Sequence, residues 1–140
     1  TEQQLAQEMA LLGVGDDLEG IGDILSKELG RLAQKKIKTG RVFSKEGWED
    51  IQKLHRVGVE NFETALAAFT SPSEELVLKI KHQAWHFKEL QQEFRIKHIQ
   101  RLHEKKPESV ETSSLHLDVL VNLRRISDHL VRLGELTLKT

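Results

Sequence analysis

The stretch from Ser113 to Leu133, SSLHLDVLVNLRRISDHLVRL, decides the fold. Its apolar residues recur at alternating spacings of four and three: Val119, Leu123, Ile126, Leu130 and Leu133. This spacing predicts an α-helix with one apolar face. A row of polar residues with the same spacing lies beside it: Asp118, Asn122, Arg125, His129 and Arg132. Such a helix buries its apolar face only against other helices, which the rest of the chain must supply.

The first part of the chain carries another helical pattern. Its apolar residues are Leu11, Val14, Leu18, Ile21, Leu25, Leu29 and Leu32. Gly13 and Gly15 predict a bend or a fresh start near Asp16 and Asp17, where two carboxylates suit a helix N-terminus. A lysine-rich end followed by Gly40 predicts that the helix stops there.

Two more helices are predicted in the middle of the chain. Ser44 is the expected N-cap of a helix whose apolar row is Trp48, His55, Val59, Phe62, Leu66 and Phe69. The expected N-cap of the next helix is Ser71. Pro72 follows it at the first helical position, and Glu74 completes a capping box. That helix has the row Leu76, Ile80, Ala84, Phe87, Leu90 and Phe94, and is expected to run to about His103.

Together these patterns predict an all-α fold, an antiparallel four-helix bundle that forms a single domain over residues 1–140. A net charge of −1 argues against a nucleic-acid partner. No apolar run approaches the roughly 20 residues that cross a bilayer, so we expect that the chain does not itself span a membrane. Because the chain starts at Thr1, we expect it to be a fragment of a longer protein.

Three pieces of the sequence resemble a known family when they are taken jointly. They are LEGIGDIL from Leu18 to Leu25, KKIKTGRVFSKEGWEDI from Lys35 to Ile51, and ESVETSSLHLDVLVNLRRISDHL from Glu108 to Leu130. They resemble the PhoU-like domain that follows the membrane region in bacterial sodium/phosphate cotransporter-family proteins.

The resemblance implies a PhoU-like bundle on the cytoplasmic side of the cell membrane. It would be a C-terminal part of an integral membrane protein, would have the transmembrane transporter region as its partner, and would regulate phosphate transport. A homo-oligomer is compatible with this assignment. Two alternatives stay open, a small metal-dependent helical-bundle enzyme and a stand-alone PhoU-like phosphate-signalling regulator.

The PhoU family also carries an acidic motif, E/D-x-x-x-D, which binds metal ions in some members. Residues Glu19 to Asp23 match the motif, whereas its second copy, Arg124 to Asp128, has lost the first acid. The resemblance thus implies Glu19, Asp23 and Asp128 as candidate ligands for a weakly bound Mg, Mn or Fe ion. The helical count instead places the first pair towards solvent, with Asp23 beside Lys27, and favours a solvated acidic face.

Trp85, Arg124 and Arg125 are the candidate interaction residues. Trp85 lies off the apolar row of its helix, which is compatible with burial beneath a neighbour or with a docking surface. We expect His55 at the edge of the core, and His82 and His86 on the surface. The chain has no cysteine, tyrosine, nucleophile elbow or glycine-rich phosphate loop, and we therefore predict that it is not an enzyme and has no tightly bound cofactor.

Overall fold

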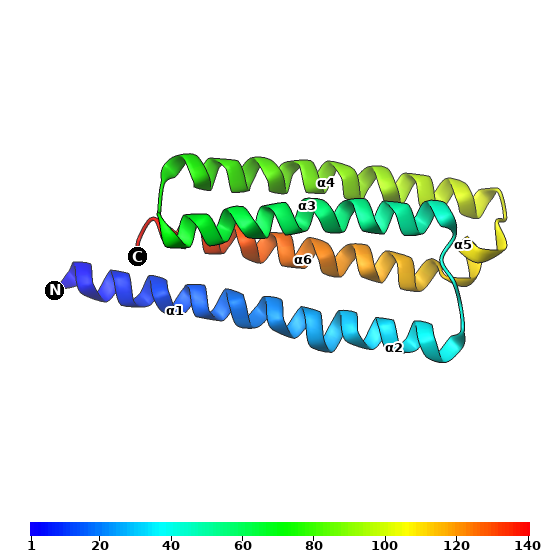
Figure 1. Cartoon of the computed structure of the whole chain (residues 1–140), viewed down its shortest axis with the longest axis horizontal. Helices are drawn as coiled ribbons and strands as arrows, with labels where there is room; N and C mark the ends of the chain where they lie inside the picture. Colours follow the sequence, from blue (N-terminus) through cyan, green and yellow to red (C-terminus); the bar gives the residue numbers. More distant parts are fainter.

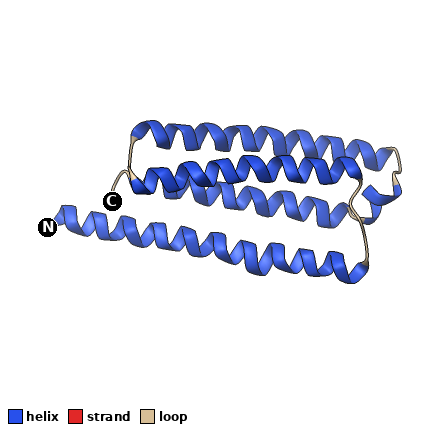
Figure 2. Ribbon diagram, viewed as in Figure 1, coloured by secondary structure: helices blue, strands red, loops and turns tan.

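The computed structural model describes residues 1–140 and contains helices but no strand (Figure 2). Its elements are α1 (Glu2–Asp23), the π-helical η1 (Ile24–Leu29), α2 (Gly30–Thr39), α3 (Lys45–Thr70), α4 (Glu74–His103), α5 (Pro107–Glu111) and α6 (Ser113–Thr137). The elements α1, η1 and α2 follow one another without a break and form one long rod (Figure 1). The predicted all-α class with antiparallel successive long helices is confirmed.

The four long helices are not arranged symmetrically. Helices α3, α4 and α6 pack against one another in all three pairs, whereas α1 packs along α6 and makes no comparable contact with α3 or α4. Figure 1 shows the α1–α2 rod along one side of the other three. The molecule is therefore a three-helix core with a fourth helix laid on α6.

Helix α6 contributes to both hydrophobic clusters of the core. One cluster combines α1, α3, α4 and α6 through Val14, Ile21, Ala65, Ala68, Ile80, Leu130 and Leu133. The other combines α3, α4 and α6 through Ile51, Leu54, Phe87, Leu90, Phe94 and Leu120. The predicted apolar row of α6 is confirmed at Leu130 and Leu133, which are buried, and at Val119, Leu123 and Ile126, which are half-buried and pack against these clusters.

The predicted bend near Asp16 and Asp17 is wrong, because α1 runs straight through both glycines. A Cβ atom on Gly13 would lie 2.8 Å from Leu136 Cδ1, so this glycine lets α6 approach the backbone of α1 closely. Of the predicted row, Val14, Ile21 and Leu32 are buried as expected, but the buried face of α1 is rotated from the rest of that row. Leu11, Leu18 and Leu25 are exposed, and the residues that face α6 are Ala10, Val14, Asp17, Ile21 and, in η1, Ile24.

The predicted apolar row of α3 is likewise rotated. Trp48, Val59, Leu66 and Phe69 are exposed, and so is His55, which was expected at the core edge. The buried residues include Ile51, Leu54, Asn61, Thr64, Ala65 and Ala68. The side of α3 that packs closely on its neighbours carries small side chains such as Ala65 and Ala68, because these allow a short distance between helices. The large apolar residues lie outside this contact.

The helix ends follow local chemistry closely. The Oγ of Ser44 accepts a hydrogen bond from the Gly47 amide at 3.0 Å, and Gly40 has the left-handed φ of 66° of a helix stop. Both predicted signals are confirmed, as is the end of α4 at His103. The start of α4 is corrected: its N-cap is Ser73, whose Oγ accepts from the Leu76 amide, rather than Ser71.

Candidate functional site

A buried carboxylate joins α1 to α6. The side chain of Asp17 is fully buried, and its Oδ1 accepts from His129 Nδ1 at 2.8 Å and from Arg132 Nη2 at 2.8 Å. Its Oδ2 accepts from Arg132 Nε at 3.1 Å. We call these three residues the Asp17 cluster. A carboxylate has no proton to donate, so the contact with His129 requires the tautomer that carries hydrogen on Nδ1.

A glycine makes room for this cluster on the α1 side. A Cβ atom at Gly20 would lie 2.6 Å from His129 Cε1, so only glycine leaves space for the imidazole ring. The cluster opens to solvent in a pocket of about 320 Å³ lined by Asp17, Arg125, Asp128, His129 and Arg132. His129 and Arg132, the last two residues of the polar row predicted on α6, therefore contact α1 and hold its one buried charge.

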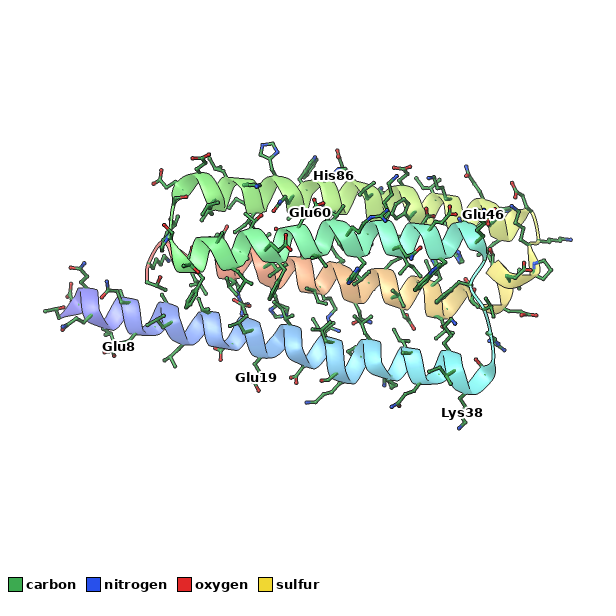
Figure 3. The ribbon with its side chains drawn as sticks, in the orientation of Figure 1. Glu8, Glu19, Lys38, Glu46, Glu60 and His86 are labelled. Carbon is green, nitrogen blue, oxygen red and sulfur yellow. The ribbon has the colours of Figure 1, made fainter.

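The candidate metal ligands lie on different surfaces. Glu19 and Asp23 are exposed on α1, and Figure 3 shows Glu19 pointing away from the other helices. Asp23 forms the expected ion pair with Lys27 at 3.3 Å. Asp128 pairs instead with Arg124 on α6 at 3.2 Å. No three or more histidine or acidic residues come together as a possible ligand set. The structure does not bring the three candidates into one site.

The candidate interaction residues are also separated. Arg124 bridges Asp128 to Gln91 of α4, and Arg125 donates to Asn122 Oδ1 at 2.9 Å beside the Asp17 cluster. Trp85 is exposed on α4, where its Nε1 donates to Glu89. Of the two interpretations left open for Trp85, burial beneath a neighbouring helix is wrong. His82 and His86 are exposed as expected, and Figure 3 shows His86 pointing outward.

A second polar cluster lies inside the end of the bundle where α4 ends and α3 and α6 begin. The rings of His98 and His116 are stacked with centroids 4.7 Å apart, and each residue is 1% exposed. His98 Nε2 shares a hydrogen bond with Ser113 Oγ at 2.8 Å. Next to them, Arg101 Nη1 lies 3.5 Å from the Asp50 carboxylate, which is long for a hydrogen bond.

Burial determines how these groups titrate. Burial, the nearby His98 and the Arg101 guanidinium together lower the pKa of His116 from 6.5 to about 4. Burial and Arg101 also lower the pKa of His98. Burial raises the pKa of Asp50 despite the opposing charges of Lys97 and Arg101. The two imidazoles are therefore neutral in the folded protein at neutral pH.

An apolar groove lies between α2 and the start of α3. Its volume is about 560 Å³, and ten of its twelve lining residues are hydrophobic. The floor includes Ile51, Leu115 and Val119, and Ile37, Val42 and Trp48 line its exposed parts. The remaining two lining residues are Lys36 and Lys45.

Sequence reasoning missed both buried polar clusters, although the spacing held a signal for each. Asp17 continues the three-four spacing of Ala10, Val14 and Ile21, so it lies on a core-facing position. His98 and Arg101 continue the spacing of Phe87, Gln91 and Phe94 in the same way. A polar residue in such a row is informative because its burial requires a partner.

Comparisons with known proteins agree on one family. A family model described as PhoU domain matches residues 51–137, which include most of α3 and all of α4, α5 and α6. In Salmonella typhimurium, a protein named "Putative inorganic phosphate export protein YjbB" is 30% identical over 120 residues, which are 86% of this chain and 21% of that protein. The protein of the same name in Escherichia coli K12 is 26% identical over 131 residues, or 90% of this chain and 24% of that protein.

The chain thus spans about a fifth to a quarter of the length of these relatives. No solved structure gives a significant match to it. None of its helices combines the length and the apolar character needed to cross a bilayer.

Replacing Asp17 tests whether the Asp17 cluster holds α1 on α6. Asp17→Asn removes the charge that Arg132 and His129 contact, and we expect it to lower the free energy of unfolding by roughly 1.5–3 kcal/mol, the usual value of charge-assisted hydrogen bonds. The matched control is Asp16→Asn, at the exposed neighbouring position, which should change the free energy of unfolding by less than about 0.5 kcal/mol. Urea unfolding measures both, and equal effects would contradict the role of the cluster.

The stacked histidines predict a loss of stability in acid. Because the folded-state pKa of His116 lies below its unfolded value, the unfolded chain binds more protons as the pH falls from 6.5 towards 4. We expect His116 to contribute a loss of about 2 kcal/mol between pH 7.5 and pH 5. His116→Gln should reduce this loss and the control His82→Gln, on the surface, should keep it. An unchanged acid profile in His116→Gln would refute the assignment.

The exposed acidic pair predicts weak metal binding at most. One carboxylate pair supplies too few oxygens to replace the hydration shell of a small divalent ion. Calorimetric titration of the chain with Mn²⁺ should give heats no larger than those of the Glu19→Gln/Asp23→Asn variant. Tight stoichiometric binding that these substitutions abolish would establish the pair as a metal site.

Proposed function

The chain belongs to the PhoU domain family, and from this premise we propose that it is the regulatory and interaction domain of a phosphate-transporting membrane protein. The names of the relatives support the link to phosphate, since both are named for inorganic phosphate export. Their length supports a larger parent, because the matching part is about a fifth to a quarter of each. A role in phosphate transport or its regulation follows at this coarser level.

The finer proposal places the domain on the cytoplasmic side of the membrane in a sodium/phosphate cotransporter-type protein. Its partner is the transmembrane transporter region of the same protein. The support is the resemblance of its three sequence pieces to the PhoU-like domain of that family. In this arrangement the domain passes on a signal about phosphate and leaves the movement of the ion to the membrane region.

The observation that carries the proposal is the two-part construction of the domain. The family match covers the three mutually packed helices, whereas the α1–α2 rod lies outside it. The rod is attached to α6 through a contact that combines the apolar residues Val14 and Ile21 with a single buried ion cluster. A partner that competes for Arg132 or for the surface of α6 would shift the rod, and this shift is the proposed output.

A metal-dependent enzyme is the competing function. It would need several ligands in one place, and the candidates Glu19, Asp23 and Asp128 are instead spread over two helices and paired with Lys27 and Arg124. No observation favours this alternative, so we do not propose it.

The experiment uses cells that express the complete parent protein, a version without residues 1–140, or the Asp17→Asn variant. Phosphate flux is followed with radioactive orthophosphate in phosphate-replete and phosphate-starved cells. We expect the first two to differ in how flux responds to phosphate supply, and Asp17→Asn to reproduce part of that difference while Asp16→Asn does not. Unchanged flux and response in all variants would overturn the proposal, as would a parent reading frame without membrane segments.

A further inference from the structure

The turn that joins α2 to α3 lies at one end of the molecule (Figure 1). Apolar side chains are exposed in and around it. We call residues 35–48 the α2–α3 tip. Ile37 is 80% exposed, Val42 65% and Trp48 49%. Trp48 is nevertheless held in place, because its ring stacks on Phe43 with centroids 6.3 Å apart. The tip therefore presents ordered apolar groups directly to its surroundings.

The same segment is strongly basic. Six cations and no acid lie between Glu28 and Glu46: Arg31, Lys35, Lys36, Lys38, Arg41 and Lys45. Arg31 pairs with Glu28 at 2.9 Å, whereas the other five form no ion pair with a carboxylate. Figure 3 shows Lys38 pointing away from the helices. The tip itself contains five of these cations and one carboxylate, Glu46, which lies 3.8 Å from Lys106. The tip therefore has a net positive charge although the whole chain has a net charge of −1.

The contacts that two of these cations do make leave their charge available. The guanidinium of Arg41 donates to the neutral backbone carbonyl of Glu111 at 2.9 Å. The ammonium of Lys36 lies 5.6 Å from the centre of the Phe43 ring. Both contacts fix the side chain without neutralising it, so the tip is a positioned cluster of charge beside exposed apolar groups.

The apolar groove opens at this tip. Ile37, Val42 and Trp48 line it together with the lysines Lys36 and Lys45. Apolar surface beside cations matches a partner that offers hydrocarbon beneath a layer of negative charge. Nucleic acid and acidic peptides would satisfy the cations, but they offer no matching layer for the exposed aliphatic side chains of Ile37 and Val42.

We propose that the α2–α3 tip docks on an anionic phospholipid surface. Ile37, Val42 and Trp48 enter the interface between headgroups and acyl chains, where tryptophan is favoured, and the lysines and Arg41 contact lipid phosphates. The inference rests on the charges and exposure of the tip and is independent of any role in phosphate transport. Docking would fix the end of the α1–α2 rod at the membrane while the three-helix core extends from it.

The test is co-sedimentation of the chain with vesicles of phosphatidylcholine, alone or with one part in three phosphatidylglycerol. We expect binding to the anionic vesicles that weakens as salt is raised, and little binding to the neutral ones. Inorganic phosphate should compete no better than other salts of equal ionic strength, since the ligand is a lipid surface. Binding to nucleic acid or to an acidic peptide without binding to anionic vesicles would overturn the proposal.

Matched variants locate the contact. Lys35→Gln/Lys36→Gln/Lys38→Gln should lower the partition coefficient on the order of a hundredfold, and the control Lys53→Gln/Lys79→Gln/Lys139→Gln should lower it much less. Ile37→Ser/Val42→Ser should also weaken binding, whereas Leu5→Ser/Leu12→Ser, equally exposed on α1, should not. Equal binding of the tip variants and their controls would refute the tip as the docking site.

A second measurement follows a signal from the tip itself, so it does not rely on comparing weakened variants with their controls. In Trp85→Phe the only remaining tryptophan is Trp48. Its emission should shift to shorter wavelength when anionic vesicles are added, because the indole moves into a less polar environment. An unshifted spectrum under conditions in which the chain sediments with the vesicles would place the contact elsewhere.

Discussion

The attachment of α1 depends on one buried charge. Asp17 has no exposed surface, and a carboxylate in that position is tolerated only because Arg132 supplies hydrogen bonds and a compensating charge from α6 and His129 supplies a further hydrogen bond. This need for partners also constrains how the two helices pack. It fixes the rotation and register of α1 on α6, since a shift of one turn would leave the carboxylate buried without a partner. Apolar contacts alone specify register far less strictly.

The rest of the architecture follows from α6. This helix packs on α1, α3 and α4, so its surface is divided among an apolar row, a polar row and a set of small residues. Gly134 is one of these small residues, because a Cβ atom there would lie 2.7 Å from Ile80 Cδ1. The sequence predicts the polar row, and the structure shows that its last two residues, His129 and Arg132, bind Asp17. Helices α3 and α4 complete the core, to which α1 adds Val14 and Ile21.

Much of the fold could be predicted from the sequence because helix ends are encoded locally. Ser44 and Gly40 act through their own backbone neighbours, and the structure confirms both. The faces of α1 and α3 could not be predicted in the same way, because they depend on which partner lies opposite. In α3 the helical spacing predicts a row of mostly large apolar residues, whereas Ala65 and Ala68 are among the residues that are fully packed, because small side chains permit short distances between helices.

The buried polar groups were missed for a related reason. Asp17 and His98 continue the spacing of buried residues on their helices, but they are polar by type, and only the structure shows which partners on α6 make their burial possible. The candidate metal residues show the opposite case. Their identities match a family motif, but Glu19, Asp23 and Asp128 are separated by the packing of α1 on α6, and Asp128 is paired with Arg124. Residue identity indicated chemistry, and the geometry decided which groups can act together.

We infer that the Asp17 cluster is needed to hold α1 on the three mutually packed helices α3, α4 and α6. Hydrogen-exchange mass spectrometry of the wild-type chain and of Asp17→Asn tests it most directly, because exchange reports local opening helix by helix. The account predicts that amides in residues 2–39 lose protection in the variant, while those in α3, α4 and α6 keep it. Uniform loss across all helices, or unchanged protection in α1, would contradict it.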